Sequence, residues 1–481
     1  MPEAAAAATP AARPLSPVLR LTLIFALVHL ILAVVIPLVE DEAYYALWAT
    51  VPSAGYYDHP PMIAWWIAAG EALFGPTRLG VRLLATLGYA AVTPLVARIA
   101  LLASGEPRLA FRAALFYNAT ALILAMGFIA TPDAPSTFFW ALTAWALAEA
   151  LAAPRSQGWW LVAGLASGLG VLSKFTNLFL WVGLALWLLA SRAGRAQLGR
   201  RATWAGAGLA LAVLVPFAAW NLAHHGAGLT RQFSRLGGAA EAPSLAGLAI
   251  FLATTAVLVT PLIAAAALQG ARRPGPARLQ LWLGAPLLAY MSFHALHSSI
   301  QLNWMAPLFP GAAVLAALGS RRWPARRTAA AAGLGLALGT LYLALAFWPG
   351  PPVFPGRNPA NETKGWPAFR AELTAEMARS GARWIATDAY GLTGALSWEL
   401  PDTPVWSITG ADRYIFRGPL PAALCDAPGL LVTAGKPAAS SLARFAQHGS
   451  PAPLARRAGQ AVLLSYTATP VRGLAPCATL P

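Results

Sequence analysis

Apolar residues are grouped in long runs along the first 349 residues, and most runs are long enough to cross a bilayer as a helix. The runs predict helices at residues 19–38, 80–103, 110–130, 135–152, 159–173, 176–190, 204–222, 245–269, 279–297, 302–319 and 328–348. The two short runs on either side of Ser173 and Lys174 predict tilted or half-length helices. The pattern indicates a mostly α-helical, polytopic bundle of about eleven transmembrane helices.

Residues 350–481 follow a different pattern, in which short apolar or alternating runs are separated by Pro and Gly. Such runs predict β-strands, here at 383–387, 404–408, 429–432 and 461–466, with a helix over 367–379. We therefore divide the chain into a transmembrane domain (1–349), whose first external loop covers 39–79, and a small C-terminal α/β domain (350–481).

Composition supports a lipid environment for most of the chain. Hydrophobic residues make up 58% and charged residues only 11%, against about 25% charged in ordinary soluble domains. The net charge of +16 does not indicate nucleic-acid binding, because the basic residues occur in short clusters between apolar runs rather than on one soluble face. The first apolar run is longer than the core of a signal peptide and no small-residue cleavage site follows, so we expect it to be retained.

The basic clusters in short loops fall on one side of the predicted bundle. With a cytoplasmic N-terminus, the inside loops carry Arg108, Arg112, Arg155, Arg192, Arg195, Arg200, Arg201, Arg272, Arg273, Arg278, Arg321, Arg322, Arg326 and Arg327. The opposite loops carry Glu40, Asp41, Glu42, Asp58, Glu71 and Asp133. Because basic loops stay in the cytoplasm, this predicts a cytoplasmic N-terminus and an extracytoplasmic C-terminal domain.

Two cysteines, Cys425 and Cys477, both lie in the C-terminal domain. An extracytoplasmic location is oxidising and favours a disulfide between them. Two unpaired thiols are the alternative, because sequence alone does not give the distance between the residues.

The first external loop carries the strongest signal of chemistry. It opens with three acids, and Asp41 is followed by Tyr44 and Tyr45 at helical spacing. A carboxylate between aromatic rings could bind a sugar or deprotonate a hydroxyl group. An interfacial acidic helix start beside an aromatic belt is an equally good reading of these residues.

Further acids occur in the same loop and in the next one. Asp58 and His59 precede two prolines and a short apolar stretch, 63–66, which we expect to lie along the membrane surface. Asp133 stands between two apolar helices, where an acid is functional by default, although it could also cap the following helix. We expect Asp41, Asp58 and Asp133 to converge in one water-accessible pocket just outside the bilayer.

These segments resemble a known family. The segments that carry the resemblance are 41–45, 57–61, 131–133, 173–176 and 303–307, followed in the C-terminal domain by 365–366, 388–390, 398–401 and 412–414. They look like the GT-C superfamily of glycosyltransferases, most closely the bacterial lipid A aminoarabinose transferase and protein O-mannosyltransferase-like family. The resemblance covers nearly the whole chain in order.

The resemblance implies an enzyme of the bacterial inner membrane that moves a sugar, with inversion, from a polyprenyl-phosphate donor. The implied acceptors are lipid A, lipopolysaccharide core, another surface glycan or a protein. Asp41 would be the general base and Asp133 a second catalytic acid. Two departures, His59 where relatives have lysine and Tyr44 where they often have arginine, weaken the case for aminoarabinose as the sugar.

The same resemblance requires a binding site for the donor. The residues expected to bind substrate or donor are Glu42, Tyr44, Tyr45, Asp58, His59, Lys174, His225, Arg231 and Arg235. Lys174 could hold the phosphate as a point charge, or it could be a lysine that extends its amine to the membrane surface. Arg231 and Arg235 could attract phosphate, or they could form a solvated helix face.

No metal or other cofactor is expected, because a phosphate leaving group and a carboxylate base suffice and no three-ligand signature is present. A divalent cation remains the alternative, since some superfamily relatives use one. Two non-enzymatic functions also remain: a transporter and a non-catalytic lipid-binding membrane protein. A transporter would place polar groups at mid-membrane, often in repeats, and the sequence shows no clear repeat.

Overall fold

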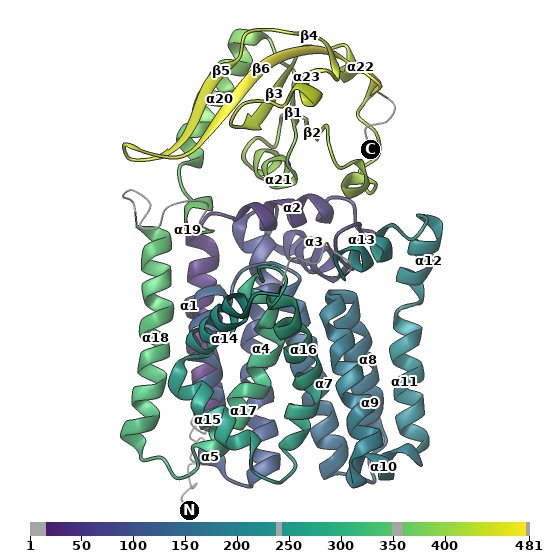
Figure 1. Cartoon of the computed structure of the whole chain (residues 1–481), viewed down its shortest axis with the longest axis vertical. Coiled ribbons are helices and arrows are strands. Elements are labelled where there is room, and N and C mark those ends of the chain that lie inside the picture. Colours follow the sequence, from purple (N-terminus) through teal and green to yellow (C-terminus); the bar gives the residue numbers. More distant parts are fainter. Residues whose placement is uncertain (1–15, 237–242, 349–358, 478–481) are drawn as a thin grey trace, which may run out of the picture.

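A bundle of long helices and a smaller α/β unit are stacked along the long axis of the molecule (Figure 1). The computed structural model describes residues 16–236, 243–348 and 359–477. The bundle contains α1 (Pro17–Val35), α4 (Arg78–Ser104), α5 (Pro107–Asn118), α6 (Ala121–Met126), α7 (Asp133–Ala152), α8 (Gly158–Ser173), α9 (Leu178–Ala190), α10 (Arg192–Leu198), α11 (Arg201–Val213), α12 (Val215–Ala223), α14 (Leu245–Val259), α15 (Pro261–Ala271), α16 (Arg278–Ala295), α17 (Phe309–Gly319) and α18 (Ala325–Phe347). Three further helices, α2 (Glu40–Ala49), α3 (Met62–Phe74) and α13 (Ala227–Leu236), lie between the bundle and the α/β unit.

Each predicted apolar segment coincides with helix, but several are broken. Residues 245–269 form α14 and α15, which meet at an angle of 99°, and Pro261 starts the second helix. Proline has no backbone N–H to continue the helix, and Thr260 just before it has a φ of 80°. Four described helices are long and apolar enough to cross a membrane, or six if each bent pair is one span. The mostly helical, polytopic fold is confirmed, and the number of eleven spans stays a prediction.

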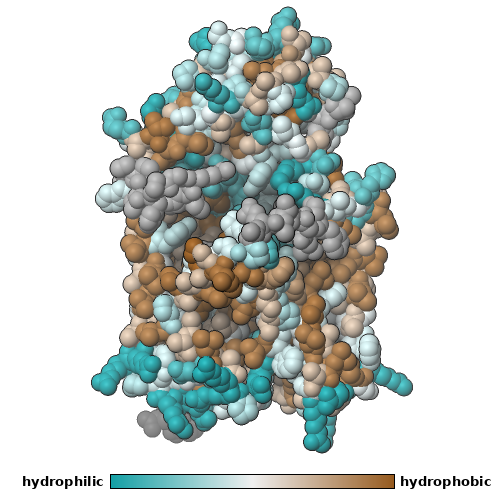
Figure 2. Space-filling model, viewed as in Figure 1, coloured by the Kyte–Doolittle hydropathy of each residue, from teal (hydrophilic) through white to brown (hydrophobic). Residues whose placement is uncertain are grey.

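The outer surface of the bundle is apolar. Figure 2 shows that the visible face of the helical part is largely hydrophobic, with hydrophilic residues at its lower rim. On α1 alone Leu23, Leu27 and Ile31 are at least half exposed, which would be costly in water. The exposed arginines of the rim include Arg155, Arg192, Arg272, Arg321 and Arg326. They lie opposite the α/β unit, as the charge pattern predicts, and the orientation across the membrane remains a prediction from that pattern.

The α/β unit is built on one six-stranded sheet. Its strands are β1 (Trp384–Thr387), β2 (Val405–Ser407), β3 (Gly429–Ala434), β4 (Phe445–His448), β5 (Ala452–Ala458) and β6 (Ala461–Leu474), in the order β2-β1-β3-β6-β4, with β5 paired to β6. β1 is parallel to β2 and β3, whereas β6 is antiparallel to β3. The helical elements are α19 (Pro359–Glu362), α20 (Trp366–Ser380), α21 (Tyr390–Glu399), η3 (Ala411–Tyr414), α22 (Ala422–Cys425) and α23 (Ala439–Leu442).

The core of this unit lies between α20, α21 and the sheet. Phe369 and Leu373 on α20 pack with Ile385 and Leu430 from the central strands. The four strands and the helix predicted from sequence are present, while β4 and β5 were missed because exposed polar residues interrupt their apolar pattern.

Cys425 and Cys477 form a disulfide with 5.8 Å between their Cα atoms, as the sequence favours. The predicted domain boundary at residue 350 lies outside the described residues.

Two glycines allow α21 to lie directly on α2. A Cβ atom at Gly394 would be 2.6 Å from the backbone nitrogen of Tyr44, and one at Gly391 would be 2.6 Å from Oε2 of Glu40. The first neighbour is backbone, whereas the second is the end of a flexible side chain that can move. Close approach of the two helices therefore depends mainly on Gly394.

We expect Gly394→Ala to destabilise the protein by about 1–3 kcal/mol, because the added methyl group must push α21 away from α2. The measurement is the thermal unfolding midpoint of the purified protein in detergent. Gly391→Ala is the matched control, since both changes bring the same gain in helix propensity. An equal midpoint for the two variants would contradict the assigned packing.

Candidate active site

The first turn of α2 is built from three acids that stabilise the start of the helix. Their negative charge complements the helix dipole, and the carboxylate of Glu42 accepts a hydrogen bond from the Val39 N–H at 3.1 Å. Helical spacing then places Asp41 beside Tyr44 and Tyr45, as predicted. The acids therefore stabilise the helix and also carry candidate chemistry.

A cavity of about 550 Å³ lies where α2, η1 (Phe175–Asn177), α9, α16 and the α/β unit meet. Its lining residues include six of the predicted ones, namely Asp41, Tyr44, Tyr45, Asp58, His59 and Lys174. Aromatic and apolar residues from the bundle complete one wall: Phe175, Phe179, Tyr290, Met291 and Trp304. The cavity is large enough for a sugar and combines a polar side with an apolar side.

Asp41 is the carboxylate on this cavity with the most perturbed environment. Its Oδ1 accepts a hydrogen bond from the Tyr390 hydroxyl at 3.1 Å. Burial raises the pKa of Asp41 above its usual range, the Tyr390 hydrogen bond opposes this, and the charges of Glu40, Asp58 and Asp133 raise it further. A carboxylate with a raised pKa is a stronger base when it is ionised.

Asp58 is held by several partners. Its Oδ2 accepts hydrogen bonds from the Tyr44 hydroxyl at 3.0 Å and from the Arg413 guanidinium, and Arg231 Nε lies 3.5 Å from Oδ1. The side chain of Gln232 donates to the Asp58 backbone carbonyl. Two cations and one hydroxyl thus hold this buried carboxylate in place, so that Asp58 anchors the first loop to the α/β unit.

Asp133 and Lys174 form a buried ion pair at the edge of the cavity. Lys174 Nζ lies 2.7 Å from Asp133 Oδ1, and the Asn303 amide donates to Oδ2 at 2.7 Å. The amine also lies 5.5 Å from the centroid of the Trp304 ring. Lys174 thus lines the cavity while Asp133 holds its amine in place.

The expected convergence of three acids is only partly correct. Asp41 and Asp58 line the large cavity, but Asp133 is 2% exposed and lines a separate space of about 10 Å³, enough for one water molecule. Lys174 separates Asp133 from the cavity. The physical reason is the ion pair itself, because a buried carboxylate needs a counter-charge and lysine supplies it.

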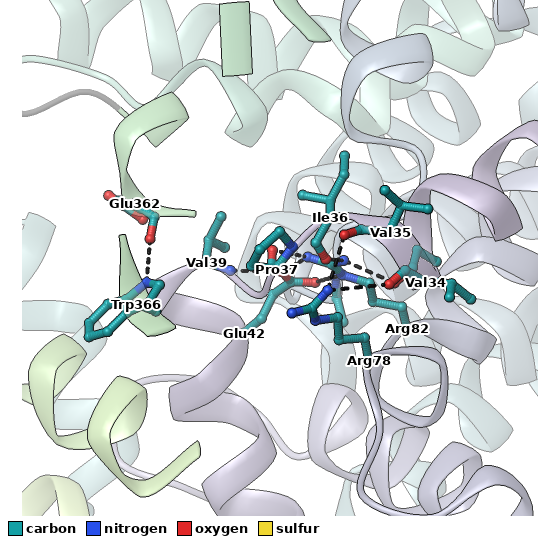
Figure 3. Close-up of polar contacts among 12 residues, drawn as sticks. Val34, Val35, Ile36, Pro37, Val39, Glu42, Arg78, Arg82, Glu362 and Trp366 are labelled. Atoms are coloured by element: carbon teal, nitrogen blue, oxygen red, sulfur yellow. Dashed lines mark hydrogen bonds and ion pairs between the residues drawn. The ribbon is translucent and has the colours of Figure 1, made fainter. Parts of the chain in front are cut away.

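Glu42 does not line the cavity, so the expectation that it contacts substrate is wrong. It is fully buried against Arg82, whose Nε and Nη2 lie 2.7 and 2.5 Å from the two carboxylate oxygens (Figure 3). Arg82 also donates to the backbone carbonyls of Ala33, Ile36 and Pro37 at 3.1, 2.6 and 3.0 Å. The Ala130 N–H donates to Glu42 Oε1 at 2.8 Å. This pair ties the end of α1, the start of α2, α4 and the turn before Asp133 together.

The predicted basic residues near α13 have different positions. His225 is exposed and is not among the residues that line the cavity, so its contact with donor stays a prediction. Arg231 is paired with Asp58, and its guanidinium lies 5.7 Å from the centroid of the Tyr57 ring. Its positive charge therefore balances the Asp58 carboxylate. The side chain of Arg235 lies outside the described residues.

Sequence reasoning missed three functional neighbours. Tyr390 and Arg413 come from the α/β unit and reach the acids of the first loop, more than 300 residues earlier. Both lie in segments that carried the family resemblance, but nothing in one sequence couples them to Asp41 or Asp58. Arg82 could have been found, because an arginine inside an apolar run requires a buried partner.

The described residues contain no group of three or more His, Cys, Asp or Glu side chains placed to hold a metal ion. Whether the reaction requires a metal stays a prediction from the sequence.

The chain is similar in sequence to several known glycosyltransferases. Residues 58–220 match the family model for dolichyl-phosphate-mannose-protein mannosyltransferase. The chain is 28% identical over 383 residues to the lipid A galacturonosyltransferase RgtD of Rhizobium johnstonii, covering 75% of this chain and 77% of that protein. It is 35% identical over 176 residues to the undecaprenyl phosphate-α-4-amino-4-deoxy-L-arabinose arabinosyl transferase of Pseudomonas aeruginosa, covering 35% of this chain and 31% of that one.

A solved structure shares the fold over nearly the whole chain. ArnT from Cupriavidus metallidurans, bound to undecaprenyl phosphate, superposes with a TM-score of 0.64 at 16% identity, covering 96% of this chain and 98% of that one. The helical bundle and the C-terminal α/β unit thus occur together in a protein of the same architecture.

Proposed function

We propose that the chain is a GT-C glycosyltransferase that takes a sugar from a polyprenyl-phosphate carrier and transfers it to lipid A or a related glycolipid outside the cytoplasm, which the matches to a mannosyltransferase family model and to lipid A sugar transferases support. The observation that carries the proposal is Asp41, a carboxylate with a raised pKa that faces a cavity of about 550 Å³ beside Lys174. A relative that matches this chain over 383 residues is named for lipid A, which supports the choice of acceptor.

In the proposed reaction Asp41 removes the proton from an acceptor hydroxyl. The hydroxyl oxygen attacks C1 of the sugar while the bond from C1 to the phosphate oxygen breaks, and the electron pair leaves with the polyprenyl phosphate. One displacement inverts the anomeric centre. The step requires no nucleotide, because the carrier phosphate is already a good leaving group.

Lys174 is suited to hold that phosphate. Its amine has three donors, of which one is used by Asp133, and it faces the cavity under the Trp304 ring. Because the ion pair fixes the amine, little side-chain entropy is lost when phosphate binds. The apolar wall formed by Phe179 and Tyr290 continues from this point along α9 and α16, where a lipid chain could lie.

The placement of the acids favours a transferase over a transporter. Asp41 belongs to α2, and Asp58 to the segment between α2 and α3; both helices lie under the α/β unit at one end of the bundle rather than half-way along it (Figure 1). Transport sites usually lie near mid-membrane. Fixed carboxylates at the end of the bundle serve a substrate that approaches from one side.

The function is tested with the purified full-length chain in liposomes that contain lipid A. Undecaprenyl-phosphate galacturonate and undecaprenyl-phosphate aminoarabinose are offered separately, and the product is identified by mass spectrometry. We expect one sugar to be attached to lipid A with inverted configuration, and a deletion strain to lack the same glycolipid. An unchanged set of envelope glycolipids in the deletion strain, together with no transfer in liposomes, would reject the proposal.

Lys174→Met is expected to raise the KM for the donor about tenfold or more, because a charged hydrogen bond to phosphate contributes roughly 1.5–3 kcal/mol. The measurement is transfer rate against donor concentration. The variant leaves Asp133 without its cation, so Lys174→Met/Asp133→Asn is the control that removes both charges. If the double variant recovered both stability and donor affinity, Lys174 would have only a structural role.

A further inference from the structure

The catalytic base of the proposed reaction accepts a side-chain hydrogen bond from the α/β unit. The Tyr390 hydroxyl donates to Oδ1 of Asp41 at 3.1 Å, and no described residue donates a hydrogen bond to Oδ2. Tyr390 is the first residue of α21, which lies on α2 through Gly391 and Gly394. The position of the hydroxyl is thus set by the contact between the two helices.

Tyr390 is itself held in place. The Arg413 guanidinium lies over its ring at 4.5 Å, and the ring meets the Tyr44 ring edge-on at 5.1 Å between centroids. Arg413 in turn binds Asp58. Side chains of the first loop and of the α/β unit therefore alternate in one connected set around the cavity.

We propose that Tyr390 is a positioning residue for the general base: its hydroxyl binds one oxygen of Asp41, directs the other oxygen to the acceptor, and keeps the carboxylate ionised. This inference rests on the proposed function and extends it, because it makes the C-terminal α/β unit a part of the active site. The bundle alone has the base but lacks the group that orients it.

The hydroxyl is a stable donor for this task. Burial first, and then the Asp41 charge, raise the pKa of Tyr390 above its ordinary value, so it stays protonated at physiological pH. A hydrogen bond to the charged form of a carboxylate lowers its pKa. Tyr390 thus opposes the rise in the pKa of Asp41 that burial causes, and it widens the pH range in which the Asp41 carboxylate is ionised.

Other groups around Asp41 also set its ionisation. The titratable and charged side chains that face it or share its cavity are Glu40, Tyr44, Tyr45, Asp58, His59, Asp133, Lys174, Tyr290, His294, Tyr390 and Arg413. Asp58 and Asp133 are each paired with cations, which reduces their effect. Among these groups Tyr390 is the hydrogen-bond donor to Asp41 that a single substitution can remove without changing a charge.

The test is the pH dependence of kcat for Tyr390→Phe in the full-length protein. Loss of the hydrogen bond raises the pKa of Asp41 further, so we expect the acid limb of the profile to move by about one unit to higher pH. Activity should approach the wild-type value at alkaline pH, within a few-fold, while the KM for donor is unchanged. A residue that only supports the fold would lower activity equally at every pH.

Tyr414→Phe is the matched control, because it removes a hydroxyl from the same unit without a contact to Asp41. It should keep the wild-type acid limb. If Tyr390→Phe left the limb in place, or changed KM alone, the positioning role would be refuted. The proposed function fails separately, namely if Asp41→Asn retains transfer, so the two failures can be told apart.

Discussion

Asp41→Asn is expected to reduce kcat for sugar transfer by about 10²–10⁴-fold while the KM for donor changes little. Asparagine keeps the shape of the side chain and can still contact the Tyr390 hydroxyl, but it cannot accept a proton from the acceptor. The measurement is steady-state transfer to lipid A at saturating donor. The raised pKa of the wild-type carboxylate also predicts that activity falls as pH falls through a value above the usual aspartate range.

Asp58→Asn is the matched comparison for this prediction. Asp58 lines the same cavity, but Arg413, Arg231 and Tyr44 occupy its oxygens. We expect Asp58→Asn to lower the stability of the protein and to loosen the contact between the first loop and the α/β unit. Its kcat loss should be smaller than that of Asp41→Asn, and the acid limb of the pH profile of kcat should remain. Equal rate losses with equal pH profiles in the two variants would remove the reason for assigning the base to Asp41.

Arg82→Met is expected to cost about 3–5 kcal/mol of stability, because it leaves the buried Glu42 carboxylate without its cation. Both side chains of the pair are 0% exposed, so water cannot take the place of the guanidinium. Three backbone carbonyls at the end of α1 lose a donor at the same time. The measurement is the unfolding midpoint in detergent, read together with the fraction of protein that inserts into the membrane.

The double variant Arg82→Met/Glu42→Gln separates charge from packing. It removes the unpaired charge, so we expect part of the stability to return, although the backbone carbonyls remain without their donor. Arg98→Met is an external comparison, because Arg98 pairs with Glu149 at 2.6 Å while its own side chain is 47% exposed. Its cost should be small. An Arg82→Met variant as stable as wild type would show that Glu42 needs no cation.

The sequence was sufficient to predict the features that depend on local pattern. Apolar runs located the helices, alternating runs located four strands, and helical spacing placed Asp41 beside Tyr44 and Tyr45. The acidic loop was also recognised as the centre of the candidate site, because charge close to lipid requires a reason. These features each depend on residues within a few turns of one another.

Features that depend on distant contacts could not be predicted in the same way. The sequence put Glu42 with the substrate-binding residues because it is adjacent to Asp41, but helical geometry turns it toward Arg82, 40 residues away. The contact of Tyr390 with Asp41 spans 349 residues and depends on how the α/β unit lies on the bundle. The breaks within helices, such as the one at Pro261, were visible as prolines, but their angles were not.

The acids near the cavity differ in whether a cation is paired with them, and this difference matters at the end of each turnover. Asp58 and Asp133 have fixed counter-ions, so in the proposed reaction Asp41 is the acid whose charge changes when the acceptor loses its proton. The next cycle can begin only after that proton returns to bulk water. Tyr390, which donates a hydrogen bond to this carboxylate, is 39% exposed, so water at the surface of the protein lies one side chain away from the proton on Asp41.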